Sequence, residues 1–248
     1  MKYLVLTFLL LLSYSLIAKA QEAFDYLEIY SIPSDGCGLS PNEVSIRYKK
    51  NNTEFIEKKG VDYPTNHPLY DEYPDIISKT ILLQTFIDSS TTVLIGFTKG
   101  LSCDLAFNFY DSKTFEPIGY ASGTQLIIPG NGVLYSQGHN NSEFNMRKKY
   151  VFQDKKVTEL FPELYYVGVN SYTLRPITIY SDWELSNKLA ELPANYSVEV
   201  IAAKKPAPKI WKWKYLIKTS FGLIGWCKIE VNQDSLGGDI KGMYYKGD

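Results

Sequence analysis

Aromatic and basic side chains alternate in one short stretch near the C-terminus. In KIWKWKY, the sequence alternates Trp211, Trp213 and Tyr215 with Lys212 and Lys214. In an extended strand, this spacing places the rings on one face and the ammonium groups on the other. Such a surface suits a sugar or an anionic polymer. The favoured alternative is that the rings fill the core, where aromatic residues are ordinary, and that Trp211 is the most exposed of them.

Carboxylates form the second set of candidates. The segment YDEYPD contains Asp71, Glu72 and Asp75, and Asp104 lies further along the chain. A glycoside hydrolase needs two carboxylates about 5 to 10 Å apart, one of them with a raised pKa. These four residues are therefore the first candidates for acid–base catalysis. The alternative is a solvated acidic loop or an incidental calcium contact.

Histidine is too scarce to suggest a metal centre. The chain contains only His67 and His139, and neither has a partner at a ligating spacing. A structural zinc site needs four ligands and a catalytic one at least three. The chain also lacks a phosphate-binding glycine loop, a nucleophile elbow and a dinucleotide fingerprint. We expect no metal and no cofactor, and we assign no catalytic residue.

The three cysteines fall into two kinds of surroundings. Cys37 and Cys103 lie in polar, turn-rich stretches, whereas Cys227 lies inside an apolar strand pattern. We expect a disulfide between Cys37 and Cys103, and we expect Cys227 to be a small buried side chain. The alternative for a cysteine here, a catalytic thiol, requires an accessible electropositive site with a histidine nearby.

The N-terminus has the form of a secretory signal peptide. Lys2 gives a positive start, residues 3–17 are almost wholly apolar, and residues 18–20 read AKA before Gln21. The apolar run is too short for a retained transmembrane helix. We predict cleavage after Ala20, a secreted or periplasmic location, and no integral membrane span in the mature chain.

The charge balance argues against nucleic acid as a partner. The chain has 26 basic and 27 acidic residues, and cleavage removes Lys2 and Lys19, so the mature chain has a net charge of 24 − 27 = −3. Nucleic-acid affinity depends on many Lys and Arg contacts to phosphates, which release counterions. A chain this close to neutral is not typical of such proteins.

β-Strands must position these residues, because alternation with a period of two dominates the mature chain. In NEVSIRYKK, for example, Val44, Ile46 and Tyr48 share one face. The segments IIPGNGVL and YVFQDKKVTEL predict hairpins from their turn residues. KTILLQTFI, residues 79–87, favours a strand over a helix, and residues 60–76 form a long loop. We expect an N-terminal antiparallel domain that is a sandwich, a barrel or a blade-like meander.

The C-terminal part carries a family resemblance. ITIYSD (177–182) is followed by LPANYSVEVI (192–201), then by an aromatic strand and a glycine turn that ends in GLIGW. With Gly222, Gly225 and Trp226, this pattern resembles the bacterial Src-homology-3-like domain. Asn195 stands where that family usually has glycine, and Cys227 replaces an aliphatic residue. The KKPAPKIWKWK insert also lengthens one loop.

The resemblance implies a small, usually non-catalytic β-barrel that accompanies cell-wall enzymes and binds peptidoglycan or its peptide stems. It also implies a set of candidate ligand-binding residues. They are Tyr180, Trp183, Trp211, Trp213 and Trp226.

The expected organisation divides the chain into four parts. They are a signal peptide (1–20), an antiparallel β domain (21–170), a Src-homology-3-like barrel (171–231) and a C-terminal tail (232–248). We expect an all-β, secreted, non-catalytic binding protein of the bacterial cell envelope, with wall glycan, wall peptide or an envelope protein as its partner. The alternative is a cell-wall hydrolase with catalytic carboxylates in the N-terminal domain and the barrel as its targeting arm.

Overall fold

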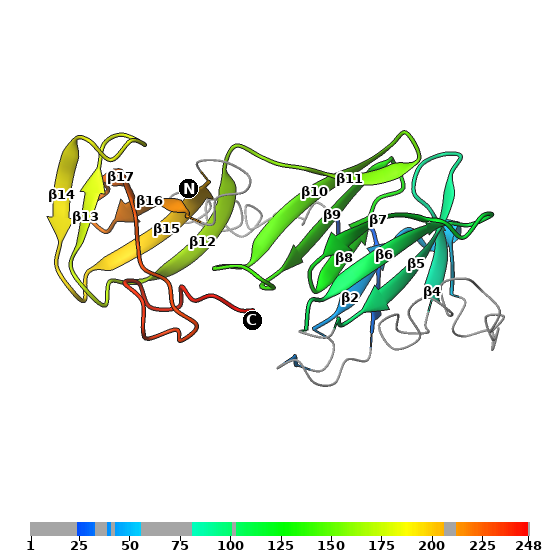
Figure 1. Ribbon diagram of the computed structural model, residues 1–248, viewed down its shortest axis with the longest axis horizontal. Coiled ribbons are helices and arrows are strands. Elements are labelled where there is room, and N and C mark those ends of the chain that lie inside the picture. Colours follow the sequence, from blue (N-terminus) through cyan, green and yellow to red (C-terminus); the bar gives the residue numbers. More distant parts are fainter. Residues whose placement is uncertain are drawn as a thin grey trace, which may run out of the picture.

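The computed structural model describes residues 24–32, 39–40, 43–55, 81–100, 103–205 and 212–247. These residues form β-strands and one short 3₁₀-helix, η1 (Lys50–Asn52), with no α-helix among them. Figure 1 shows two lobes, an N-terminal lobe built from β1 to β11 and a C-terminal lobe built from β12 to β17. The all-β class predicted from the alternation is confirmed.

The N-terminal lobe is a sandwich of two sheets. The first has the order β1-β2-β8-β9-β10-β11 and the second the order β3-β4-β5-β6-β7. The bounds are β1 (Glu28–Ser31), β2 (Ser45–Tyr48), β3 (Thr53–Phe55), β4 (Ile81–Phe86), β5 (Thr92–Thr98), β6 (Ala106–Asp111), β7 (Pro117–Ser122), β8 (Gln125–Ile128), β9 (Val133–Gly138), β10 (Met146–Gln153) and β11 (Lys156–Leu160). Ile46 and Leu126 of one sheet share a core with Ile95 and Phe107 of the other, as in face-to-face packing.

The two predicted hairpins and the strand predicted near residues 79–87 are confirmed in this lobe. β8 and β9 pair antiparallel around Gly130 and Gly132, whose φ angles are 77° and 79°. β10 and β11 pair around Asp154 and Lys155, both also at positive φ, as a two-residue hairpin turn requires. The segment predicted as a strand rather than a helix forms β4.

One pairing departs from the antiparallel arrangement that we predicted. β2 runs parallel to β8, with Ile46 opposite Leu126. A parallel pair needs a long crossover connection, and here strands β3 to β7 of the second sheet supply it. The first sheet is therefore mixed.

The C-terminal lobe is one six-stranded sheet with the order β12-β15-β16-β17-β13-β14. The bounds are β12 (Tyr165–Tyr172), β13 (Ile177–Tyr180), β14 (Lys188–Leu192), β15 (Ser197–Lys204), β16 (Lys214–Thr219) and β17 (Ile224–Cys227). The sheet wraps around a single core and has register shifts in β12, β13 and β15. Its edge strands β12 and β14 are not paired with each other, so the sheet is open where the resemblance implies a closed barrel.

The division between the lobes differs from the expected one. β12 begins at Tyr165 and pairs with β15, so the boundary expected at residue 170 falls inside a strand. The expected tail is also part of the packed structure, since Ile240 and Met243 are fully buried in the C-terminal core. Figure 1 shows this segment, in red, returning toward the N-terminal lobe.

Some predicted features lie outside the described residues. They are the signal peptide (1–20), Cys37, the loop at 60–76 with its acidic residues, and Trp211. The disulfide between Cys37 and Cys103 therefore stays a prediction. No helix in the described part of the chain is long and apolar enough to cross a membrane.

Candidate functional site

Two of the candidate tryptophans meet on the surface of the C-terminal lobe. Trp183 lies in the connection between β13 and β14, and Trp226 lies in β17, with ring centroids 5.0 Å apart and planes at 83°. Tyr180 is the β13 residue opposite Trp226. Gly225 permits this close pairing, because a Cβ atom there would lie 2.9 Å from the Tyr180 carbonyl oxygen. Three of the five candidates are thus brought together.

Trp213 is in a different environment. It is only 6% exposed and packs edge-on against Phe144 and Tyr165, with ring centroids 5.3 Å away in each case. Tyr215, on the same strand face, is 1% exposed. These two rings fill the core, which was the favoured alternative to a ligand-binding role for the KIWKWKY stretch. Trp213 is not available to a ligand.

Two lysines surround Trp183. The ammonium nitrogens of Lys204 and Lys214 lie 5.1 and 4.6 Å from its ring centroid, within the range of cation–π attraction. Lys214 Nζ also donates a hydrogen bond to the Trp183 carbonyl oxygen at 2.8 Å. We define the aromatic–lysine surface as Tyr180, Trp183, Trp226, Lys204 and Lys214.

Asp182 holds the loop that presents Trp183. Its carboxylate accepts hydrogen bonds from the backbone N–H groups of Ser186 at 3.0 Å and Asn187 at 2.7 Å, and from the Ser186 hydroxyl. These bonds lower the pKa of Asp182 to about 2. The connection between β13 and β14 is therefore held by hydrogen bonds within the loop, and these fix the position of Trp183.

A cleft of about 570 Å³ opens between the two lobes. We call it the interlobe cleft. Its lining includes Tyr120, Asn140, Lys148 and Phe161 on the N-terminal side and Lys204 on the C-terminal side. Lys204 also forms an ion pair with Glu163 at 2.6 Å, which lowers the pKa of that carboxyl through the hydrogen bond. Because Lys204 contacts Trp183 as well, the cleft adjoins the aromatic–lysine surface.

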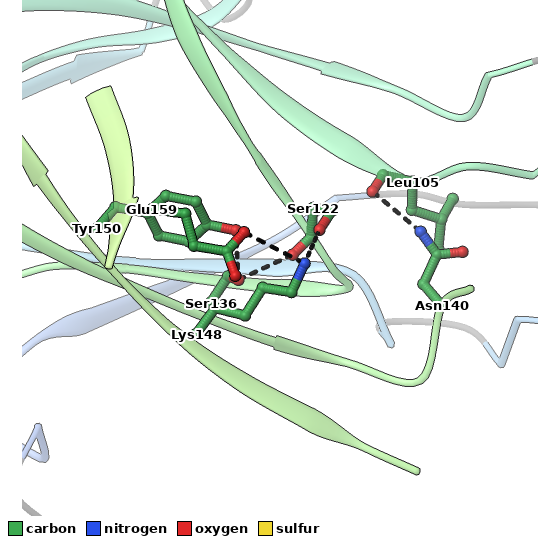
Figure 2. A network of polar contacts seen from close by, with 7 residues as sticks. All are labelled: Leu105, Ser122, Ser136, Asn140, Lys148, Tyr150 and Glu159. Atoms are coloured by element: carbon green, nitrogen blue, oxygen red, sulfur yellow. Dashed lines mark hydrogen bonds and ion pairs between the residues drawn. The ribbon is translucent and has the colours of Figure 1, made fainter. Parts of the chain in front are cut away.

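A polar network lies at the wall of the cleft (Figure 2). Lys148 Nζ donates to the Ser122 hydroxyl at 2.7 Å and lies 3.5 Å from a Glu159 carboxylate oxygen. The side chains of Lys148 and Glu159 are about one-fifth exposed, at 20% and 21%. Behind them, the Ser136 hydroxyl donates to the Ser122 carbonyl oxygen at 2.8 Å. Burial raises the pKa of the neighbouring Tyr150 to about 12, so this phenol stays protonated.

The geometry of this network suits hydrogen bonding rather than nucleophilic catalysis. A serine nucleophile needs a base that removes its proton, and lysine serves as that base only as a neutral amine. Lys148 instead donates to Ser122 and is paired with the Glu159 carboxylate. The network therefore holds Lys148 as a fixed donor at the cleft.

Asp104 is the one described member of the predicted carboxylate set. It lines the cleft and accepts a hydrogen bond from the Asn141 side chain. The other carboxylates of the cleft, Glu159 and Glu163, were not singled out from the sequence, and each is paired with a lysine. The sequence does not link them to their lysines, because Glu159 lies on β11, Glu163 lies in the connection to β12, and the partners Lys148 and Lys204 lie on other strands.

The thiol of Cys227 is inaccessible to a ligand. Cys227 is a free thiol with no exposure, as expected, and burial raises its pKa to about 12. Its thiolate is therefore disfavoured and the residue is not a nucleophile. Within the described ranges, no three His, Cys, Asp or Glu side chains are grouped so as to hold a metal ion.

Comparison of the chain with models of protein families, with curated proteins and with solved structures found no match. The site is therefore interpreted from its own geometry.

Proposed function

We propose that the protein is a secreted, non-catalytic binding protein of the bacterial cell envelope. Its C-terminal lobe is a Src-homology-3-like module that contacts peptidoglycan or a peptide or protein ligand through the aromatic–lysine surface. The signal peptide directs export, and a disulfide between Cys37 and Cys103 forms in the oxidising compartment.

The observation that carries this proposal is the grouping of two half-buried tryptophans with two lysines. Within the described part of the chain, no carboxylate lies within ion-pair distance of Lys214, so its ammonium group is available to an anionic ligand group. Peptide stems of peptidoglycan carry carboxylates, and the tryptophan rings supply apolar contact area. An aromatic and cationic surface matches that combination.

The Src-homology-3-like assignment is supported by local geometry. β15, β16 and β17 are consecutive antiparallel neighbours, and β17 leads back to β13. Asn195 adopts the left-handed conformation expected at the family's glycine position, with φ of 63°. Gly222, the first residue of GLIGW, has a φ of 99° and lies in the turn between β16 and β17.

The test is co-sedimentation of the mature full-length chain with purified peptidoglycan sacculi. We expect Trp183→Ala and Lys214→Gln each to reduce the pelleted fraction, because they remove an apolar contact and a cation of the surface. Matched controls are Phe221→Ala, at an 82% exposed ring in the turn between β16 and β17, and Lys228→Gln, at an exposed lysine on the same lobe. Both controls should pellet like the unmodified protein.

Two results would contradict the proposal. If the unmodified protein does not pellet with sacculi and captures no envelope peptide or protein, the binding function is wrong. If soluble fragments are released from the sacculi, the protein is a hydrolase, and Asp104 becomes the first described carboxylate to substitute.

A further inference from the structure

The interlobe cleft has the size and shape of a small-ligand site. Small-molecule sites typically occupy about 300 to 1,000 Å³ and often lie where two structural units meet. The cleft measures about 570 Å³ and takes its walls from both lobes. It includes neither Trp183 nor Trp226, and Lys204 is the residue that it shares with the aromatic–lysine surface.

Two large rings stand exposed in this cleft. Tyr120, on β7, is 64% exposed, and Phe161, in the connection between β11 and β12, is 66% exposed. Leaving such rings in water forfeits the stabilisation that burial would give. Exposed apolar area gathered in a concave site is typical of a binding surface.

The charges of the described residues of the cleft cancel. These residues include three cations, Lys148, Lys204 and Lys205, and three anions, Asp104, Glu159 and Glu163. Lys148 is paired with Glu159 and Lys204 with Glu163. A site for a charged ligand concentrates one sign of charge. A charged ligand would meet no excess of the opposite charge here, and at Lys148 and Lys204 it would have to displace an existing ion pair, whereas a neutral ligand would not.

The polar groups of the cleft suit hydroxyl groups. Glu159 and Asp104 accept hydrogen bonds, the side-chain amides of Asn140 and Asn141 both donate and accept, and Lys148 only donates. The ammonium group of Lys148 has three N–H donors, of which one bonds to Ser122, and the Glu159 carboxylate lies 3.5 Å away, so at least one N–H is left for a ligand. A hydroxyl group both donates and accepts, so it can bind between such partners.

We infer that the interlobe cleft binds a short stretch of neutral carbohydrate. The rings of Tyr120 and Phe161 contact the apolar faces of the sugar, and the fixed Lys148–Glu159 pair bonds its hydroxyl groups. This site lies beside the proposed envelope-binding surface and does not depend on that surface having a ligand.

The test is calorimetric titration of the mature full-length chain with the neutral trimers of N-acetylglucosamine, glucose and mannose. An anionic trimer of galacturonic acid is titrated in parallel. We expect at least one neutral trimer to bind, and Tyr120→Ala and Phe161→Ala each to weaken that binding about tenfold, as expected for the loss of one stacked ring. Because both rings are exposed, thermal melting should confirm that the variants remain folded.

Matched controls come from equally exposed rings elsewhere. Tyr26→Ala removes a tyrosine that is 61% exposed, and Phe221→Ala removes a phenylalanine that is 82% exposed. Both controls, and Trp183→Ala, should keep the affinity of the unmodified protein, which separates this site from the aromatic–lysine surface. The inference is overturned if no neutral trimer binds, if only the anionic trimer or a peptide binds, or if the two cleft variants bind as tightly as the controls.

Discussion

Glu143 carries a carboxylate into the interface between the lobes. It precedes Phe144, which packs in the C-terminal core, and it accepts a hydrogen bond from the hydroxyl group of the buried Tyr215. Burial raises the pKa of Glu143, although the bond from Tyr215 and the charge of Lys205 oppose the rise. Burial also raises the pKa of Tyr215 well above its ordinary value. A partly desolvated charge therefore sits where the lobes meet.

At the residue scale, we predict that Glu143→Gln changes the pH dependence of stability. Because the pKa of Glu143 is raised in the folded protein, the stability that Glu143 contributes is fully present below its ordinary pKa of 4.5. This stability is lost as pH rises through the folded-state pKa. The glutamine side chain of the variant does not titrate and can still accept the Tyr215 hydrogen bond. The melting temperature of the variant, relative to the unmodified protein, should therefore increase between about pH 4 and about pH 8.

The control for this prediction is Glu116→Gln, which changes an exposed carboxylate. His139 titrates alike in the unmodified protein and in both variants, so its effect cancels in the difference between their melting temperatures. A melting-temperature difference that stays constant across the pH range would show that Glu143 is not perturbed by burial.

Single positions were predictable where the strand pattern alone decides burial. Cys227 lies in an apolar alternation and is buried, and Trp213 and Tyr215 share a face by the period of two and are both in the core. Lys148 and Glu159 could not be found in this way. The β10–β11 hairpin was predicted, but the pairing of Lys148 with Glu159 also depends on its register, and Ser122 of β7 approaches from the other sheet.

The loop between β13 and β14 illustrates how one element presents the site. Asp182 is the acceptor that closes this loop. Because its pKa is lowered in the folded protein, the stability that its carboxylate contributes is present above its ordinary pKa of 3.8 and is lost as pH falls toward about 2. We predict that Asp182→Ala frees the backbone N–H groups of Ser186 and Asn187. Amide hydrogen exchange at these two residues should become faster, and Trp183-dependent pelleting should weaken.

A matched control for the loop prediction is Asp234→Ala. Asp234 accepts a comparable hydrogen bond from the Leu236 backbone N–H at 2.9 Å, in a different turn. Exchange at Ser186 and Asn187 should not change in that variant. Unchanged exchange in Asp182→Ala would mean that the backbone turn alone holds the loop.

Elements were predictable where neighbours in sequence are neighbours in space. The β8–β9 and β10–β11 hairpins follow from short turn segments between alternating strands, and Gly130, Gly132, Asp154 and Lys155 take positive φ there. The parallel pairing of β2 with β8 did not follow, because the pattern of Val44, Ile46 and Tyr48 predicts a strand with one buried face but does not specify its partner. The pairing of β2 with β8 depends on strands β3 to β7 of the second sheet, which connect these two strands along the chain.

On the scale of the whole molecule, the C-terminal segment fastens the two lobes together. Lys246 forms a β-bridge with Ser142, and His139 Nε2 lies 3.0 Å from the Ser142 carbonyl oxygen and 2.9 Å from that of Tyr244. Both oxygens accept, so Nε2 carries a proton, and burial lowers the pKa of His139. The sequence could not predict this role, because Ile240 and Met243 are isolated apolar residues without a strand or helix period.

If this segment is part of the C-terminal core rather than a tail, Met243 must contribute to global stability. It is fully buried, so Met243→Ala leaves a cavity and should lower the free energy of unfolding by about 2 to 5 kcal/mol. Met243→Leu keeps most of the volume and should cost less than about 1.5 kcal/mol. Leu236→Ala, at a side chain that is 61% exposed in the same segment, should change stability by no more than about 0.5 kcal/mol. Denaturant unfolding measures all three, and a cost for Met243→Ala as small as that for Leu236→Ala would place the segment outside the cooperative core.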